Sequence, residues 1–219
     1  MIKLVVFDWN GTLFADNNAI MHAANSRFRL INKPELTLDQ YREAFEIPMS
    51  KTFLKLGIDP ESIKTHYVAL TTAFHETYEP LALKVKMRSG AREVLDYLDA
   101  NKISNIILSN HTEDGIKIQL ERLNIDKHFK AVLANEDIFG SHHNGKQHRL
   151  EKFLVSTKFK PNETLIIGDT SEEVLIGKAL GLNTVGLTGG FSTEAKILGA
   201  KPDVLIHKLR DIIDVIEEL

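Results

Sequence analysis

The chain contains no cysteine among its 219 residues. This absence excludes disulfide bonds, thiolate metal ligands and cysteine nucleophiles, and it agrees with a reducing compartment. An excess of positive charge is also missing, because 27 lysines and arginines stand against 30 aspartates and glutamates, giving a formal net charge of −3. No general electrostatic attraction to nucleic acid or to an anionic membrane is therefore expected.

The sequence also has no internal repeat, no low-complexity tract and no apolar stretch long enough to span a bilayer. Its N-terminus leads into an apolar segment without a basic leader, so we expect a cytoplasmic protein without a membrane partner. The length allows one α/β domain, or a core domain with a small inserted module. The oligomeric state cannot be predicted from these features.

From residue 88 onward, apolar strand-like segments alternate with helix-like segments. We expect strands at residues 103–108, 131–134, 164–167, 184–187 and 204–206. We expect helices around residues 91–101, 116–123, 150–154, 174–180 and 209–219, the fourth of them ending at Gly181. Such alternation implies right-handed crossovers and a mainly parallel sheet.

Residues 15–83 differ from this pattern, because they are helix-like and poor in strand signals. Pro34, Pro48 and Pro60 interrupt the apolar spacing, which predicts three or four short helices rather than one long helix. The apolar segment at residues 2–7 is typical of a strand of the later sheet. The sequence therefore predicts an α/β core from residues 1–14 and 85–219, with a helical insertion at 15–84.

The first strand ends abruptly in Asp8, and the next turn contains Asn10, Gly11 and Thr12. A strand buried on both faces reads as a near-continuous apolar run. In an open α/β sheet, ligands bind just beyond the carboxyl ends of such strands. Asp8 is therefore a candidate nucleophile or metal ligand, although an aspartate before Asn-Gly can also simply begin a turn.

A second apolar strand ends in an acid at Asp169, and Glu172 and Glu173 follow it. Carboxylate oxygens at such a position favour Mg²⁺. Glu172 and Glu173 could instead be ordinary acids in the first turn of a helix, where the helix dipole favours negative charge.

Two further motifs lie between these acids in the sequence. Ser109 and Asn110 follow the strand at 103–108, where Ser109 could donate a hydrogen bond to a phosphoryl oxygen. Alternatively, Ser109, Asn110 or Thr112 caps the next helix. Lys146 precedes the helix around residues 150–154 and could offset negative charge, with Lys152 as the second candidate. Either lysine could also be an ordinary solvated residue.

Taken together and in this order, the four motifs resemble those of the haloacid dehalogenase superfamily, in particular its phosphoglycolate-phosphatase-like group. The first motif of this family, Asp-x-Asp-Gly-Thr-Leu, corresponds to residues 8–13, with Asn10 in place of the second aspartate. Gln147 stands where the family often has a proline after the motif lysine. The resemblance implies a Rossmann-like three-layer core with a mainly parallel sheet and a small all-helical cap inserted after the first strand.

The resemblance further implies a Mg²⁺-dependent phosphatase of a small phosphorylated metabolite, with an aspartyl-phosphate intermediate on Asp8. Four residues would hold or support the metal: Asp8, Asn10 through its backbone carbonyl, Asp169, and Glu173 from behind. Five residues would bind or position the phosphoryl group: Gly11, Thr12, Ser109, Asn110 and Lys146. Asp169 would face Asp8 across the site.

Asn10 changes this expectation, because an amide neither donates nor accepts a proton near neutral pH. In the phosphatases, an aspartate here protonates the leaving group, and such help is worth roughly 10²–10⁴ in rate. Three compensations are open. The substrate could have a good leaving group such as an acyl phosphate, or His142, His143 or His148 could supply the proton. Each of these histidines could instead be an ordinary surface-loop residue, which is the more common case for an exposed histidine. Residue 10 could also become aspartate by loss of its side-chain amide.

Two other classes of function remain. The first is a catalytically degenerate protein that binds a phosphorylated metabolite or a protein partner without turnover, for which Asn10 is the motivation. The second is hydrolysis of a carbon–halogen or carbon–phosphorus bond, since related branches also lack the second aspartate. A phosphonatase would need a cap lysine for a Schiff base, and four are available: Lys33, Lys51, Lys55 and Lys64.

Overall fold

A computed structural model describes residues 1–138 and 145–219 of the chain and contains a six-stranded sheet. The strands are β1 (Leu4–Phe7), β2 (Ser104–Thr112), β3 (Val132–Asn135), β4 (Thr164–Gly168), β5 (Asn183–Leu187) and β6 (Val204–Ile206). They are arranged in the order β3-β2-β1-β4-β5-β6, and every neighbouring pair is parallel. The predicted parallel α/β sheet is confirmed, with β1 between β2 and β4.

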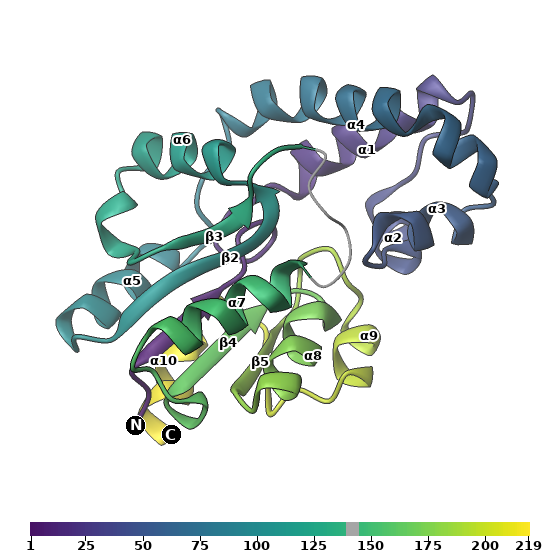
Figure 1. Cartoon of the computed structure of the whole chain (residues 1–219). Helices are drawn as coiled ribbons and strands as arrows, with labels where there is room; N and C mark the ends of the chain where they lie inside the picture. The colour runs from purple at the N-terminus through teal and green to yellow at the C-terminus, as the bar shows by residue number, and fades with distance from the viewer. Residues whose placement is uncertain (139–144) are drawn as a thin grey trace.

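Helices cover both faces of this sheet (Figure 1). One face packs against α5 (Ala91–Ala100), α6 (Glu113–Leu123) and α10 (Ile212–Glu218), and the other against α7 (Gly145–Ser156) and α8 (Ser171–Leu180). Strand β1 has buried side chains on both faces, because Val5 and Phe7 contact the first layer whereas Leu4 and Val6 contact the second. This two-sided burial explains its uninterrupted apolar sequence. The expected three-layer core is thus confirmed.

Three details differ from the expected elements. Strand β2 continues to Thr112, because its polar end still pairs with β3 through Thr112 and Asn135. The final helix begins as a short 3₁₀ turn at Leu209–Asp211 before α10. A six-residue helix, α9 (Glu194–Gly199), was not expected, since it is too short to show clear helical periodicity.

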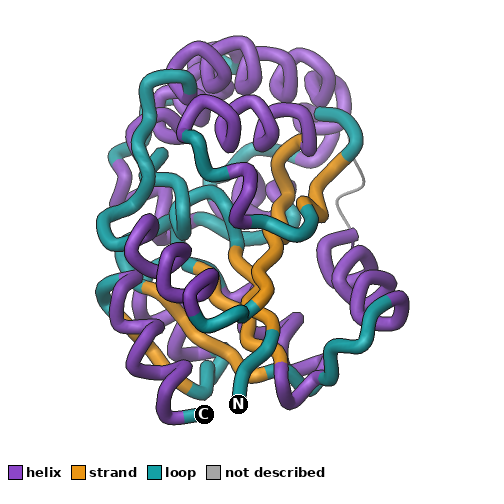
Figure 2. Tube along the Cα trace, turned by 90° about the vertical axis from the view of Figure 1, so that its left-hand side faces the viewer, coloured by secondary structure: helices purple, strands orange, loops and turns teal. Residues whose placement is uncertain are grey.

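Four helices lie between β1 and α5 in the sequence, and we call them the cap: α1 (Asn17–Leu30), α2 (Leu38–Ala44), α3 (Met49–Lys55) and α4 (Pro60–Ala82). Figures 1 and 2 show them as a helical body at the carboxyl ends of the strands. The cap has its own apolar cluster, which includes Phe28, Phe53 and Leu70. Helix α4 is longer than expected, at 23 residues, because Pro80 lies in its last turn and does not interrupt it.

The two ends of the chain lie side by side (Figure 1), where the Met1 amino group donates a hydrogen bond to the Leu219 carbonyl at 2.9 Å. None of the helices in the described part of the chain combines the length and apolar character needed to cross a membrane.

Candidate active site

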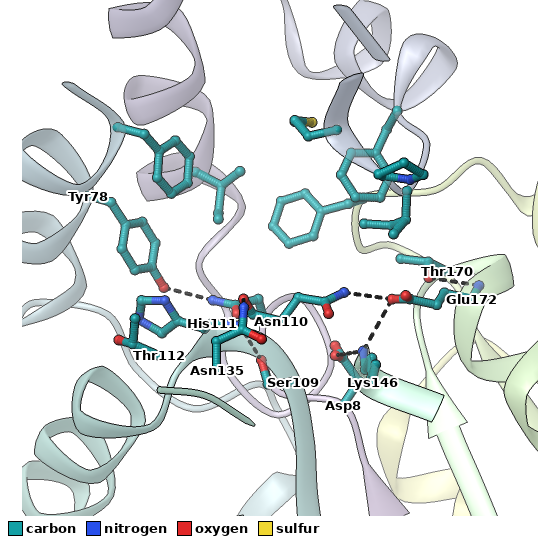
Figure 3. Close-up of a pocket in the computed structure, with 18 of the residues that line it drawn as sticks. Asp8, Tyr78, Ser109, Asn110, His111, Thr112, Asn135, Lys146, Thr170 and Glu172 are labelled. Atoms are coloured by element: carbon teal, nitrogen blue, oxygen red, sulfur yellow. Dashed lines mark hydrogen bonds and ion pairs between the residues drawn. The ribbon is translucent and has the colours of Figure 1, made fainter. Parts of the chain in front are cut away.

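The carboxyl end of β1 places Asp8 in a cavity of about 230 Å³, which is lined by residues of both the core and the cap (Figure 3). Lys146, from the first turn of α7, donates hydrogen bonds to Asp8 Oδ1 at 2.7 Å and to Glu173. Its side chain is only 3% exposed. Lys152, the second candidate, is exposed on the same helix. The lysine beside Asp8 is therefore Lys146.

Asp169 follows β4, the strand next to β1, and lines the same cavity as Asp8. Its Oδ1 accepts a hydrogen bond from the Thr12 hydroxyl at 3.1 Å, and its Oδ2 accepts one from the Phe191 amide at 2.5 Å. Gly11 has a φ of 75°, and a Cβ there would lie 2.6 Å from Asp169 Oδ2. Glycine therefore satisfies both the left-handed backbone and the close approach of Asp169. The Gly11 amide already donates to Asp16.

The two glutamates that follow Asp169 lie in the first turn of α8 and also contact the site. Glu173 is 1% exposed and accepts a hydrogen bond from the Thr170 hydroxyl at 2.6 Å. Glu172 accepts one from the Asn110 amide at 2.7 Å and lies 3.6 Å from the Lys146 ammonium. Both expectations for Glu172 and Glu173 are therefore met, because the two glutamates lie at the start of a helix and also belong to the charged cluster.

The electrostatics of this cluster favour an additional cation. Burial raises the pKa of Asp8 well above its ordinary value, and Lys146 counters this only in part. Burial, followed by the repulsion of Glu173, raises the pKa of Asp169 to about 6. Burial alone would lower the pKa of Lys146, but Asp8 and Glu173 outweigh it and hold that pKa well above its ordinary value. The excess of carboxylates over ammonium, with oxygen as the donor atom, fits a divalent cation such as Mg²⁺.

Ser109 lies in β2 and lines the cavity next to these charges (Figure 3). Its Oγ accepts a hydrogen bond from the His111 amide at 3.1 Å. The helix cap is Thr112, whose hydroxyl accepts a hydrogen bond from the Gly115 amide. Helix capping therefore does not account for Ser109 or Asn110.

Asn10 belongs to a buried network that the sequence did not indicate. Its Nδ2 donates hydrogen bonds to Asp16 Oδ2 at 2.6 Å and to the Tyr78 hydroxyl at 2.8 Å. The Tyr78 hydroxyl in turn donates to Asp16 at 2.7 Å. Asp16 is fully buried, and this burial raises its pKa to about 6. Asp16 precedes a helix, as capping residues do, but its side chain makes no capping bond, and no sequence signal linked it to Tyr78.

Of the three histidines that could replace the missing acid, the structure describes one. His148 lies on α7 with its side chain 68% exposed and does not line the cavity, so it is an ordinary surface residue and not a substitute for the missing acid. His142 and His143 lie outside the described residues. Two other histidines, His75 on α4 and His111 at the end of β2, line the cavity and were missed.

The cap contributes a mainly apolar wall to the cavity, which includes the aromatic rings of Tyr41, Phe45 and Phe74. Arg27 also lines it, with its guanidinium carbon 4.0 Å from the centroid of the Phe74 ring and its Nε donating to the Leu70 carbonyl. Within the described ranges, Arg27 forms no ion pair with a carboxylate. Burial lowers its pKa to about 10, which leaves it charged at neutral pH.

The cap lysines considered for a Schiff base were Lys33, Lys51, Lys55 and Lys64. None of them is among the described residues that line this cavity. The one lysine found there is Lys146, which comes from the core and is held by carboxylates. The phosphonatase alternative therefore loses its main requirement.

Comparison with known proteins identifies one family, and the similar proteins are phosphatases by name. Residues 5–187 match the family model of the haloacid dehalogenase-like hydrolases. The chain is 23% identical to Pyrophosphatase PpaX of Anoxybacillus flavithermus, with 98% of this chain and 97% of that protein covered. It is also 23% identical to a phosphoglycolate phosphatase of Photobacterium profundum, over 99% of this chain and 96% of the relative.

Solved structures show the same fold. A haloacid dehalogenase-like family protein from Streptococcus pneumoniae superposes with a TM-score of 0.82 at 19% identity, covering 98% of each chain. The crystal structure of a predicted phosphatase from Clostridium acetobutylicum gives a TM-score of 0.86 at 17% identity, covering all of both chains.

Proposed function

The chain belongs to the haloacid dehalogenase-like hydrolases, and we propose that it is a Mg²⁺-dependent phosphatase of small phosphorylated metabolites that reacts through Asp8. The observation that carries this proposal is the cluster of Asp8, Lys146 and Asp169, three residues from distant parts of the sequence in one cavity. The names of the relatives, a pyrophosphatase and phosphoglycolate phosphatases, support the same class of substrate.

The metal would be held by the carboxylates of Asp8 and Asp169 and by the backbone carbonyl of Asn10. Glu173 would support it from behind. Oxygen ligands and the excess negative charge suit Mg²⁺ better than a softer metal. When bound, the ion would neutralise charge and orient the oxygens of the phosphoryl group.

The reaction would proceed in two steps on the side chain of Asp8. Its carboxylate oxygen attacks phosphorus, the bond from phosphorus to the leaving group breaks, and the leaving group departs with the electron pair. The Lys146 ammonium and the Ser109 hydroxyl stabilise the charge on the phosphoryl oxygens. Water then attacks the phosphorus of the aspartyl phosphate, which releases phosphate and restores Asp8.

Asn10 limits which leaving groups can depart, because its amide supplies no proton. Both of its amide hydrogens are also committed to Asp16 and Tyr78. Leaving groups that are stable without a proton, such as the carboxylate of an acyl phosphate or the phosphate of a diphosphate, therefore suit the site better than a simple alkoxide.

The cap wall would select the rest of the substrate. Its aromatic rings favour an apolar portion of the leaving group, and the charged Arg27 favours a second anionic group. This combination of one phosphoryl group and one further anion is our proposal for the substrate class.

The decisive experiment measures phosphate release from acetyl phosphate, pyrophosphate, p-nitrophenyl phosphate and glycerol phosphate, with and without Mg²⁺. We expect release that requires Mg²⁺, is slowest for glycerol phosphate, and falls by on the order of 10⁴ or more in Asp8→Asn. Asp96→Asn, an exposed aspartate on α5, is the matched control and should keep the activity.

Equal rates for the natural sequence and Asp8→Asn would overturn the proposal. A second candidate, the catalytically degenerate binding protein, is favoured by Asn10 as well. It would be supported if the natural sequence released no phosphate from any of these compounds but still bound orthovanadate with Mg²⁺.

A further inference from the structure

Three side chains of metal-ligand type meet where cap helix α4 contacts the end of β2. His75 and Glu79 lie one helical turn apart on α4, so they share a face of that helix. His111 belongs to the last residues of β2. One ligand atom from each of these three residues can be chosen such that all lie within 4.8 Å of one another.

The spacing of these atoms is close to that of a metal site. Four ligands at 2.0–2.1 Å around a tetrahedral Zn²⁺ lie about 3.3 Å from one another. Here Glu79 Oε1 lies 3.0 Å from His75 Nδ1 and 3.7 Å from His111 Nε2. The two imidazole rings are nearly parallel, with 4° between their planes and 5.8 Å between their centroids. The histidine side chains would still have to rotate, because each imidazole nitrogen binds an ion in the plane of its own ring and the ligand atoms lie up to 4.8 Å apart.

A second observation points to a ligand at this place. His111 is 8% exposed, and its Nε2 is buried without a hydrogen-bond partner in the described part of the chain. A buried polar atom in this state is costly, and natural structures leave few of them. The 3.7 Å to Glu79 is too long for a hydrogen bond. Burial also lowers the pKa of His111 to about 4, so the ring is neutral at neutral pH, the form that binds metals.

We propose that His75, Glu79 and His111 form a binding site for one transition-metal ion of the Zn²⁺ type, separate from the site at Asp8 and Asp169. Two imidazole nitrogens and one carboxylate are a donor set that suits Zn²⁺, whereas Mg²⁺ prefers oxygen ligands only. A tetrahedral ion would have one further position, which water would fill.

The proposed ion joins two parts of the molecule, because His75 and Glu79 come from the cap and His111 comes from the core. Binding would hold α4 against β2 and so restrict opening of the cavity, which His75 and His111 both line. Cap opening admits substrate and releases product in lidded enzymes. The site would therefore act as a brake on turnover, controlled by the availability of the metal.

The first test is a binding titration on the full chain after treatment with a chelator. Zn²⁺ is added in competition with a chromophoric chelator, and Co²⁺ is used as a spectroscopic probe of tetrahedral coordination. We expect one tightly bound ion per chain, with affinity reduced more than about 100-fold in His111→Ala and in His75→Ala. Asp169→Asn should bind Zn²⁺ as the natural sequence does, because it affects only the other site.

Matched controls separate this site from the other histidines of the chain. His66→Ala removes an exposed histidine of the same helix, and Glu76→Gln is the counterpart of Glu79→Gln. The double variant His142→Ala/His143→Ala removes two consecutive histidines that could bind Zn²⁺ independently of the proposed site. Zn²⁺ affinity that is lost in this double variant but kept in His111→Ala would overturn the proposal.

Two further measurements complete the test. One identifies variants that fail to fold, and the other measures the proposed effect of Zn²⁺ on the cap. Circular dichroism in chelator identifies misfolded variants, and Glu79→Gln replaces any that fail, since its side chain is 39% exposed. Zn²⁺ should slow hydrogen exchange of α4 at least tenfold in the natural sequence and not in Glu79→Gln. Unchanged exchange on Zn²⁺ binding would overturn the joining role. Neither readout requires phosphatase activity, so the result is independent of the proposed function.

Discussion

The cavity has two walls of different character. The core wall carries charged and hydroxyl groups, among which Lys146 contacts both Asp8 and Glu173: Asp8, Ser109, Lys146, Asp169 and Glu173. The cap wall is mainly apolar, and it includes four aromatic rings and one cation without an ion pair among the described residues: Arg27, Tyr41, Phe45, Phe74 and Tyr78. The first wall is suited to bond breaking at phosphorus and the second to contact with the leaving group. Variants of the core wall should therefore change kcat, and variants of the cap wall should mainly change KM.

The walls meet at Asn10, whose amide joins Asp16 near the core to Tyr78 of α4. This contact explains why an amide is compatible with position 10. An aspartate there would place a second carboxylate within 2.6 Å of the buried Asp16, so the pair would have to retain a proton.

After the loss expected for Asp8→Asn, the largest effect is expected at the centre of the core wall. Lys146→Met removes the ammonium between Asp8 and Glu173 and leaves buried carboxylates uncompensated. We expect kcat to fall by about 10²–10³ and the free energy of unfolding, measured with urea in chelator, to fall by about 3–5 kcal/mol. Lys152→Met, an exposed lysine on the same helix, is the control. Similar losses in both variants would show that the core wall has no special role.

The next prediction concerns a double variant in which Asn10 and Asp16, at the junction of the walls, exchange their side chains. Asn10→Asp/Asp16→Asn keeps one amide and one carboxylate in contact but moves the carboxylate to the position of the general acid. We expect kcat for glycerol phosphate to rise by about 10² or more, with a smaller gain for p-nitrophenyl phosphate, whose leaving group needs little protonation. Asp16→Asn alone should give no gain. If the exchanged protein gains nothing, proton supply at residue 10 does not limit the reaction.

His111 gives a smaller effect, on stability. Burial lowers its pKa to about 4 from an ordinary 6.5, so between these values the unfolded chain binds a proton that the folded chain does not. The free energy of unfolding is therefore unaffected by the protonation of this residue above pH 6.5, and it decreases as the pH falls from 6.5 towards 4. Between pH 6.5 and 5 the loss is about 2 kcal/mol, at roughly 1.4 kcal/mol per unit.

The measurement compares the natural sequence with His111→Gln by urea unfolding at pH 7 and pH 5 in chelator. The advantage of histidine over glutamine should shrink by this amount at the lower pH. His66→Gln, which replaces an exposed ring, should show no such change. A constant difference between the natural sequence and His111→Gln would contradict the assignment.

The smallest effect is expected on the cap wall. Arg27→Met should raise KM at least about tenfold for substrates with a second anionic group, since a charge-assisted hydrogen bond contributes roughly 1.5–3 kcal/mol. KM should change more than kcat, and p-nitrophenyl phosphate, which has no second anion, should be affected least. Arg29→Met replaces an exposed arginine of the same helix and is the control. A loss confined to kcat would remove the proposed difference between the walls.

The sequence predicted the core wall far better than the cap wall. Asp8 and Asp169 were found because each ends an apolar strand, and parallel strands bring their carboxyl ends to one edge of the sheet. Arg27 and Tyr78 carried no such signal, because helical periodicity indicates which residues are buried and not which cavity they line. His148 was considered because histidine titrates in the right range, but this property does not show which way a side chain on a helix points.

By itself, the sequence determined the parallel sheet, the helical region after the first strand and the charged motifs, because these depend on local periodicity and on residues adjacent in the chain. The tertiary structure alone decided that Asp16 and Tyr78 hold Asn10, and that His75, Glu79 and His111 meet. These contacts join residues up to 68 positions apart, and they form only when the cap packs on the core. Such packing depends on the combined shape of many side chains, which no single segment of the sequence encodes.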